Sequence, residues 1–367
     1  MLVKHSLLSL FLLAMLSACG GGSDDTVAPP STPPSVDNDN PPDNGGGDDG
    51  NTGTPTDSGS LAANGCLNVV IVNGFAYAAC GSEIEVAELA TFERSLVSVS
   101  ADDITFDADE QLLFTQAGNV LTALDISDPA QPSVLGTLNT NFAAFSGLSA
   151  ANGVLVVSGG AGGSNTQVYT YTNSNNPLTL ATNGILAVDN TTGNPDVTVT
   201  ATANGVTAFY SQDIGAVANW AIQIAQLDSD GNVLSVEQDV VLTPGAFNFS
   251  SVFTPANFPV ESEFLNNRLY VANFAAEGVE VIDLEDNNAL LQPILLGYEP
   301  TNVATDGTQL FVVGVTNNTV DVVDPTSSNV VESLEPTEGL AQPTGVAASS
   351  THVVVADRTN GLLIITR

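Results

Sequence analysis

Histidine, lysine and cysteine, which often act as bases or nucleophiles in catalysis, are rare in this 367-residue chain. The chain has two histidines, His5 and His352. His5 lies in the N-terminal stretch that we interpret below as a cleaved signal, so a metal site built from several histidines is excluded. A Ser-His-Asp arrangement would have to use His352, which begins a short apolar run typical of a strand. We therefore interpret His352 as a histidine at a strand edge or turn, and assign no catalytic residue.

Two acidic segments carry oxygens that could hold a divalent cation. In Asp228-Ser229-Asp230-Gly231-Asn232 there are two carboxylates, whereas Ca²⁺ takes six to eight oxygens, and Glu237 is too near to complete an EF-hand loop. The same letters are typical of a tight turn, so a turn is our interpretation and a Ca²⁺ site at Asp228 and Asp230 the alternative. The second segment, residues 102–110, holds four Asp and one Glu. We interpret it as a solvated loop, the alternative being carboxylates that share a proton or a metal.

The composition points away from bound cofactors and nucleic acid. Trp220 is the single tryptophan, which is too few for the repeated tryptophans of quinoproteins and argues against a quinone cofactor. The glycine-rich run 159–164 lacks the Lys and the helix that a phosphate loop needs. No cofactor is assigned. The formal net charge of −36 at pH 7 repels nucleic acid and anionic lipid headgroups. We interpret this charge as solvation of the surface, with attraction of cations or a basic partner as the alternative.

Two cysteines flank the first of a series of tight turns. A hairpin that turns at Asn73-Gly74 places Leu67 beside Cys80, and therefore Cys66 within one residue of the position opposite Cys80. In an exported protein this geometry predicts a disulfide between Cys66 and Cys80. The loop that it closes is short, so we expect a contribution of about 2–3 kcal/mol to stability.

The same short turn recurs along the chain, each time followed by an apolar, β-branched run. Successive turns are 36 to 62 residues apart, and a propeller blade of four strands needs about 40–50 residues. We therefore predict an all-β, seven-bladed β-propeller with almost no helix, in which closure protects the strand edges. The seven turns are Asn73-Gly74, Asp109-Glu110, Asn152-Gly153, Asn204-Gly205, Asn266-Asn267, Asp306-Gly307 and Ser350-Thr351.

The third strand of each unit should end in a polar residue that caps the following turn. The last unit lacks a fourth strand of its own. Residues near 58–66 could supply it, or the blade could have three strands, and the sequence leaves both open. The repeat is interrupted by insertions at 211–220 and 240–262, and we expect function to lie there and in the acidic loop at 102–110. The predicted third-strand ends are Asp125, Thr172, Gln226, Asp283, Asp324 and Thr366.

The N-terminus reads as an export signal. Lys4 precedes an apolar stretch from Leu7 to Ala18, which is too short to span a bilayer. Its end, Leu16-Ser17-Ala18-Cys19, resembles a bacterial lipobox. The resemblance implies cleavage before Cys19, acylation of its thiol and, since Gly20 follows, anchoring in the outer membrane on an undetermined face. An ordinary secretory signal is the alternative.

These features divide the chain into three parts. Residues 1–18 are predicted to be a lipoprotein signal peptide. Residues 19–62 are rich in Gly, Pro and Asp and should form a disordered acidic tether, because such a segment cannot bury enough apolar surface to order itself. Residues 63–367 should form the propeller.

Three units resemble a known bacterial repeat. Asn119–Leu138, Arg268–Tyr298 and, more loosely, Gln309–Leu334 are similar to the LVIVD repeat, and more broadly the units look like seven-bladed propellers of the lactonase and quinoprotein kind. The resemblance implies an exported propeller with no assigned activity.

These observations favour a lipid-anchored, non-enzymatic binding or interaction module of the cell envelope. It would be held at the membrane through Cys19 and would bind another envelope protein or a small ligand. The alternatives are a divalent-metal-dependent, lactonase-like hydrolase and a scaffold subunit of an outer-membrane assembly.

Overall fold

The structure is a computed structural model. It describes residues 59–62, 65–140, 144–160, 165–171, 179–187, 197–202, 205–213, 220–236, 240–242, 261–337 and 339–367. All of them belong to one compact unit, Thr54–Arg367. Cys19, the predicted signal peptide and all of the predicted tether before residue 59 lie outside the described residues, so those assignments stay predictions.

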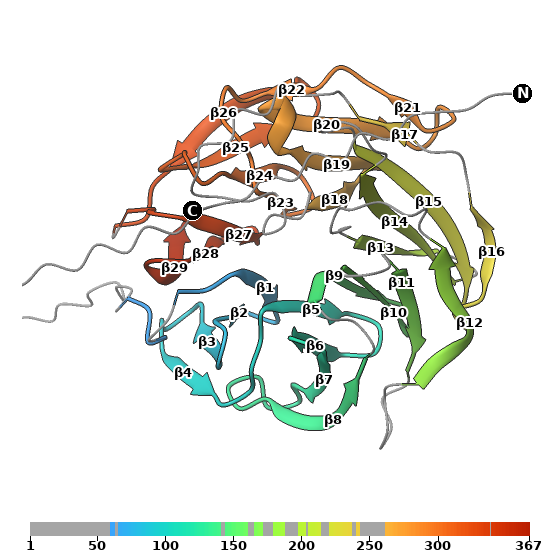
Figure 1. Ribbon diagram of the computed structural model, residues 1–367. Coiled ribbons are helices and arrows are strands. Elements are labelled where there is room, and N and C mark those ends of the chain that lie inside the picture. Colours follow the sequence, from blue (N-terminus) through green and yellow to red (C-terminus); the bar gives the residue numbers. More distant parts are fainter. Residues whose placement is uncertain are drawn as a thin grey trace, which may run out of the picture. The chain divides into compact units, whose positions relative to one another are not determined.

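In the part of the chain that the structure describes, strands β1–β29 form seven antiparallel sheets arranged around a centre (Figure 1). This confirms the seven-bladed propeller. Blade 1 consists of β1 (Asn68–Val72), β2 (Phe75–Ala79), β3 (Ile84–Glu88) and β4 (Arg94–Val97). Blade 2 consists of β5 (Asp103–Asp107), β6 (Leu112–Ala117), β7 (Val120–Asp125) and β8 (Ser133–Asn139). Blade 3 consists of β9 (Ala144–Ala151), β10 (Val154–Gly160), β11 (Asn165–Thr170) and β12 (Thr179–Ala187).

The remaining blades follow in chain order. Blade 4 consists of β13 (Val197–Thr202), β14 (Gly205–Asp213), β15 (Trp220–Asp228), β16 (Val233–Val236) and β17 (Val240–Val241). Blade 5 consists of β18 (Ser262–Leu265), β19 (Arg268–Asn273), β20 (Gly278–Asp283), β21 (Ala289–Leu290) and β22 (Ile294–Leu295). Blade 6 consists of β23 (Asn302–Thr305), β24 (Leu310–Val313), β25 (Val320–Asp324) and β26 (Asn329–Leu334). Blade 7 consists of β27 (Pro343–Ala348), β28 (His352–Asp357) and β29 (Gly361–Thr366).

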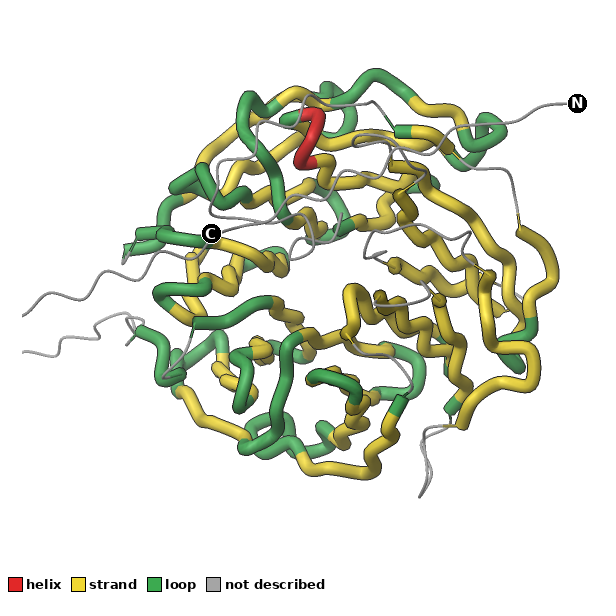
Figure 2. The backbone as a smooth tube through the Cα atoms, viewed as in Figure 1, coloured by secondary structure: helices red, strands yellow, loops and turns green. Residues whose placement is uncertain are grey.

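The helix content is as low as expected. Among the described residues the helical element is one short 3₁₀ turn, η2 (Phe274–Ala276), drawn in red in Figure 2.

The connections define two faces of the ring. Because consecutive strands are antiparallel, the first-to-second and third-to-fourth connections of every blade lie on one face, which we call the turn face. The second-to-third and blade-to-blade connections lie on the opposite face, which we call the loop face. The first strand of each blade lies nearest the centre (Figure 1).

Three of the seven repeated turns have the backbone that the sequence predicts, whereas in Asp306-Gly307 only Gly307 has positive φ and in Ser350-Thr351 neither residue does. Both turn residues have positive φ in Asn73-Gly74 (51° and 82°), Asn152-Gly153 (49° and 75°) and Asn266-Asn267 (52° and 59°). Asn and Gly tolerate this conformation, which matches the twist of a hairpin. In blade 2 the prediction is displaced: the positive φ falls on Gln111 (55°), after the predicted Asp109-Glu110.

The hydrophobic core lies between the blades. Tyr77 and Val86 of blade 1, for example, pack with Ile104 and Leu113 of blade 2. The other described clusters likewise join the strands of one blade to the next. Since both faces of a blade are covered, its inner strands carry continuous apolar runs.

The ring closes between blades 7 and 1, and the described part of blade 7 has three strands. The segment before β1 runs along blade 7: the Cys66 N–H donates to the Asp357 carbonyl at 2.9 Å. Gly65 permits this approach, since a Cβ there would lie 1.6 Å from the Arg358 carbonyl oxygen. Cys66 and Cys80 are joined by a disulfide, as predicted. The predicted register of this hairpin is also confirmed, with Val72 opposite Phe75.

A buried ion pair lies at the same junction. The Arg94 guanidinium contacts the Glu85 carboxylate at 2.8 Å, and their side chains are 1% and 0% exposed. Arg94 also donates to the carbonyl of Leu362 in blade 7, at 3.1 Å. Glu85 accepts further bonds from the backbone N–H groups of Leu61 and Ala62. The pair therefore ties the N-terminal segment, blade 1 and blade 7 together.

Candidate functional site

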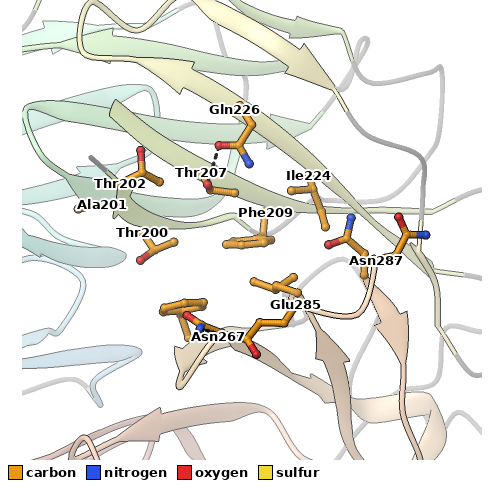
Figure 3. A pocket seen from close by; sticks show the side chains of 13 residues that line it. Thr200, Ala201, Thr202, Thr207, Phe209, Ile224, Gln226, Asn267, Glu285 and Asn287 are labelled. Atoms are coloured by element: carbon orange, nitrogen blue, oxygen red, sulfur yellow. Dashed lines mark hydrogen bonds between the residues drawn. The ribbon is translucent and has the colours of Figure 1, made fainter. Parts of the chain in front are cut away.

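A pocket of about 640 Å³ lies between blades 4 and 5. Its lining residues come from the end of β13, the start of β14, the end of β15 and the connections that follow β18 and β20 (Figure 3). These segments all belong to the turn face. The volume falls within the roughly 300–1,000 Å³ that is typical of small-molecule sites.

The apolar part of the pocket is built by both blades. Phe209 of β14 and Phe264 of β18 lie nearly parallel, with their ring centroids 6.4 Å apart and their planes inclined by 16°. Ile224 of β15 and Leu284, just after β20, also line the pocket. Because Phe209 is 1% exposed and packs in the core between the blades, the aromatic surface open to a ligand is that of the half-buried Phe264.

A polar pair lies beside Phe209 and Ile224 on the same face of the blade 4 sheet. The Thr207 hydroxyl donates to Oε1 of Gln226 at 2.8 Å, drawn as a dashed line in Figure 3. The two residues are directly opposite each other on β14 and β15. Their side chains therefore stand on the same face of the sheet.

The other blades place an apolar pair at this position. Counting back two residues from the end of each third strand, the residue and its partner on the second strand are apolar and buried in six of the seven blades. Blade 4 alone has Thr207 and Gln226 at this position. The six apolar pairs are Tyr77–Val86, Phe114–Ala123, Val156–Val168, Tyr270–Val281, Phe311–Val322 and Val354–Ile364.

Each of these apolar pairs packs against the following blade. Val156 and Val168 of blade 3 contact residues of blade 4, and Tyr270 and Val281 of blade 5 contact blade 6. In blade 4 the same space, toward blade 5, is lined by a hydroxyl and an amide. The pocket therefore lies where one blade departs from the repeated core.

The predicted role of Gln226 is corrected by this register. The sequence predicts it as the capping residue at the end of a third strand, but β15 continues to Asp228. The capping function belongs to Asp228, whose Oδ1 accepts the N–H groups of Asp230 and Asn232. Among the other predicted ends, Asp125, Asp283 and Asp324 accept N–H groups of their following turns, as expected. Thr172 lies outside the described residues.

The rim of the pocket is polar and carries no positive charge among its lining residues. Thr200 and Thr202 contribute hydroxyls, and Asn287 and Asn288 contribute amides. The one carboxylate, Glu285, accepts a hydrogen bond from the amide of Asn267.

Three carboxyl groups lie on the opposite, loop face, at the start of first strands. Burial raises the pKa of Glu261, and the charges of Asp103 and Glu263 raise it further. Burial also raises the pKa of Asp103, although its Oδ1 accepts the Asn68 amide at 2.6 Å. Burial raises the pKa of Glu263 to about 7. These groups come from blades 2 and 5, so they sense one another's charge across the centre of the ring.

The acidic segment 102–110 is divided by β5 between the two faces. Asp103 begins the strand and bonds Asn68 of blade 1. Asp107 ends it, is fully buried, and accepts bonds from Gly153 N–H and the Tyr171 hydroxyl of blade 3. Asp107 thus fastens blade 2 to blade 3, so the interpretation of residues 102–110 as a solvated loop is wrong: the segment contains strand β5 and a buried carboxylate.

The remaining predicted chemistry falls on turns and strand edges. The Asp228 carboxylate is used by its own turn, and Asn232 also donates its side-chain amide to it. A Ca²⁺ ion at Asp228 and Asp230 stays a prediction. His352 begins β28, with Nδ1 2.9 Å from the Thr351 hydroxyl, and burial lowers its pKa.

Metal-type ligands converge at one point of the described residues. Cys66, Cys80 and Glu85 have ligand atoms within 4.8 Å of one another, but both sulfurs are in the disulfide and cannot act as thiolates. The carboxylates of Asp103, Glu261 and Glu263 do not converge to this distance.

The pocket lies outside the segments in which the sequence predicts function. Those segments are the insertions at 211–220 and 240–262 and the acidic loop at 102–110; residues 214–219 and 243–260 lie outside the described residues. The signal lay instead inside a strand. Aligning IAQLD (224–228) with VEVID (279–283) places a glutamine where the repeat has valine.

None of the helices among the described residues has the length and hydrophobicity required to cross a membrane.

Comparisons with known proteins support the fold. Residues 116–140, which include β7 and β8, match the family model of the LVIVD repeat, as the resemblance of Asn119–Leu138 predicts. The chain is similar to one in the "Crystal Structure of Mitotic Checkpoint Complex", with a TM-score of 0.60 and 12% identity, over 89% of this chain and 96% of that one. It is also similar to the WD40 beta propeller domain of Doa1, with a TM-score of 0.55 and 10% identity, over 84% and 95%. No curated protein matches this sequence.

Proposed function

We propose that this protein is a non-enzymatic binding module that takes its ligand in the pocket between blades 4 and 5. The observation that carries the proposal is the replacement of one repeated core pair by Thr207 and Gln226, at the place where the pocket lies. Six blades show that the fold packs an apolar pair there. The fold does not require a polar pair at this junction. We therefore attribute Thr207 and Gln226 to ligand binding, since small-molecule sites combine apolar walls with a few polar groups.

The proposal includes a location and a class of partner. Acylation of Cys19 would hold the propeller at the outer membrane, and the ligand would be a small molecule or a segment of another envelope protein. The net charge of −36 argues against nucleic acid. These points rest on the sequence.

Blocking the pocket tests the binding proposal. Ala201 lines the pocket and is exposed, so Ala201→Trp should fill the mouth without disturbing the core. Ala130→Trp, at an exposed position outside the pocket, is the matched control. With a panel of small molecules and short peptides, at least one compound should raise the Tm of the wild type and of Ala130→Trp but not that of Ala201→Trp. Equal responses of all three proteins would refute the proposal.

The anchor is tested separately. Cys19→Ala should move the protein from the membrane fraction to the soluble fraction. Unchanged partitioning would contradict lipidation at Cys19.

A divalent-metal-dependent hydrolase is the second candidate, favoured by the carboxyls of Asp103, Glu261 and Glu263. Carboxylates that raise one another's pKa are often used for proton transfer or cation binding. This candidate predicts that millimolar Ca²⁺ raises the Tm, that EDTA reverses the effect and that Glu261→Gln abolishes it. A Tm that responds to neither reagent would exclude it.

A further inference from the structure

The lining of the pocket also restricts the class of ligand, and the restriction rests on the binding function proposed above. Anionic groups such as phosphate or carboxylate are bound by Arg, Lys or clustered N–H donors. The residues that line the pocket include no Arg, Lys or His. The large negative charge of the chain repels anions as well.

Cations are disfavoured for a different reason. A divalent cation needs several oxygen ligands, usually with more than one carboxylate. The pocket has the single carboxylate of Glu285, which accepts a bond from the Asn267 amide.

A wholly apolar ligand also fits poorly. It would cover the half-buried ring of Phe264, but it would bury the amide nitrogen of Gln226 without a hydrogen bond. Each buried group left without a partner costs about 1–3 kcal/mol. Of the polar side chains that line the pocket, Thr207 and Asn267 already donate to protein groups, so this cost falls on groups such as the Gln226 amide nitrogen.

The geometry points to a neutral, polyhydroxylated ligand, and we infer that the pocket binds a saccharide. A pyranose ring has C–H groups on its faces, which can pack against aromatic rings, and hydroxyls at its edge. The pocket offers matching surfaces: the half-buried ring of Phe264 from blade 5, and the Gln226 amide with the Thr200 and Thr202 hydroxyls from blade 4. Hydroxyls both donate and accept, as the Thr, Asn and Gln side chains require.

The amide of Gln226 is the key contact. Its oxygen already accepts the Thr207 hydroxyl, while its nitrogen lies on the side toward Ile224, which also lines the pocket (Figure 3). Two N–H donors beside an aromatic surface suit a pair of hydroxyl oxygens on one sugar ring.

The test restores the apolar pair of the repeat. In Thr207→Val/Gln226→Val, blade 4 acquires the Val–Val pair of blade 3, so the variant should fold. Full-length protein in detergent is titrated calorimetrically with maltotriose, cellotriose and N,N′-diacetylchitobiose, and with glucuronic acid and trialanine as anionic and peptide probes. At least one neutral saccharide should bind with a Kd of about 1 mM or tighter. The double variant and Phe264→Ala should each weaken that binding at least tenfold, and Ala130→Trp should not.

Each outcome decides the inference. Failure of all three saccharides to bind, or equal saccharide binding by the wild type and the double variant, would overturn it. If trialanine or glucuronic acid bound and Ala201→Trp blocked it, the ligand class would be wrong while the binding function stood. If no probe distinguished Ala201→Trp from the wild type, both proposals would fail.

Discussion

Two junctions of the ring differ sharply in how they are filled. Between blades 7 and 1 the polar groups are buried and fully engaged: Arg94 lies between Glu85 and the Leu362 carbonyl, and the Cys66–Cys80 disulfide lies beside them. Between blades 4 and 5 the polar groups line an open pocket, and Thr207 bonds Gln226 on its wall.

The difference separates two uses of polar residues in a repeated fold. At the closure, the chain must join segments that are far apart in sequence, and buried charges and a disulfide specify how they meet. At the pocket, the neighbouring blades are consecutive in the chain and need no such device. Polar groups there remain able to bond water or a ligand, so changes at the two junctions should have very different costs.

The largest effect is expected from breaking the buried ion pair at the closure. Arg94→Met leaves the Glu85 carboxylate buried without its cation, which costs about 3–5 kcal/mol. Urea unfolding should show a lower midpoint with an unchanged slope. Removing both charges in Arg94→Met/Glu85→Gln should recover part of the loss.

The exposed pair Arg268–Asp283 is the matched control. Its atoms are 3.4 Å apart, and its side chains are 37% and 19% exposed. Arg268→Met should cost less than about 1 kcal/mol. Equal losses for Arg94→Met and Arg268→Met would show that the closure does not depend on a buried charge.

Removal of the disulfide should have the next largest effect. Cys66→Ser/Cys80→Ser opens a loop of 14 residues, and a loop of this length contributes about 3 kcal/mol. Because both positions are fully buried, part of the loss will come from packing. Reduction of the wild type with dithiothreitol in mild urea should lower its unfolding midpoint, while the variant should not respond.

The stability contributed by Glu263, a carboxyl whose pKa is raised by burial, should fall with rising pH. Burial raises the pKa of Glu263 from 4.5 to about 7, so the folded state holds a proton that the unfolded state releases between these values. Stability should therefore fall as pH rises from about 4.5 to 7, by about 3 kcal/mol.

Replacing Glu263 by Gln should remove this part of the pH dependence. The variant should match the wild type near pH 4 and exceed it in stability at pH 8. Parallel stability curves for the two proteins across this range would contradict the assignment.

Much of the architecture could be read from the sequence, because local rules determine it. Asn-Gly turns require positive φ, and the Asn73-Gly74 hairpin sets the register that brings Cys66 to Cys80. Both follow from residues close together in the chain. The sequence left open whether residues near 58–66 complete blade 7 or whether that blade has three strands. In the described part of the chain it has three strands.

The candidate site could not be predicted from the sequence, because it depends on strand register and on contacts between blades. Gln226 looks like a strand end until β15 is seen to continue to Asp228, and only then does it fall opposite Thr207 at a core position. Phe209 and Phe264 belong to different blades, 55 residues apart, and nothing local indicates that their rings meet. The Arg94–Glu85 contact with Leu362 is hidden in the same way.

The smallest effect on stability is expected at the pocket, and it is the most specific test of the contrast. Thr207→Val removes one hydrogen bond and leaves Oε1 of Gln226 without its protein donor. At the junction of blades 7 and 1 such a loss would leave a buried polar group without a hydrogen bond. In the pocket, water can take the place of the Thr207 hydroxyl. The cost should therefore stay below about 1 kcal/mol. In Thr207→Val/Gln226→Val both polar groups are gone, and stability should be equal to or greater than that of the wild type, as measured by urea unfolding. A loss of 2 kcal/mol or more in the double variant would mean that the polar pair is structural, and the departure of blade 4 from the repeat would then no longer indicate a binding site.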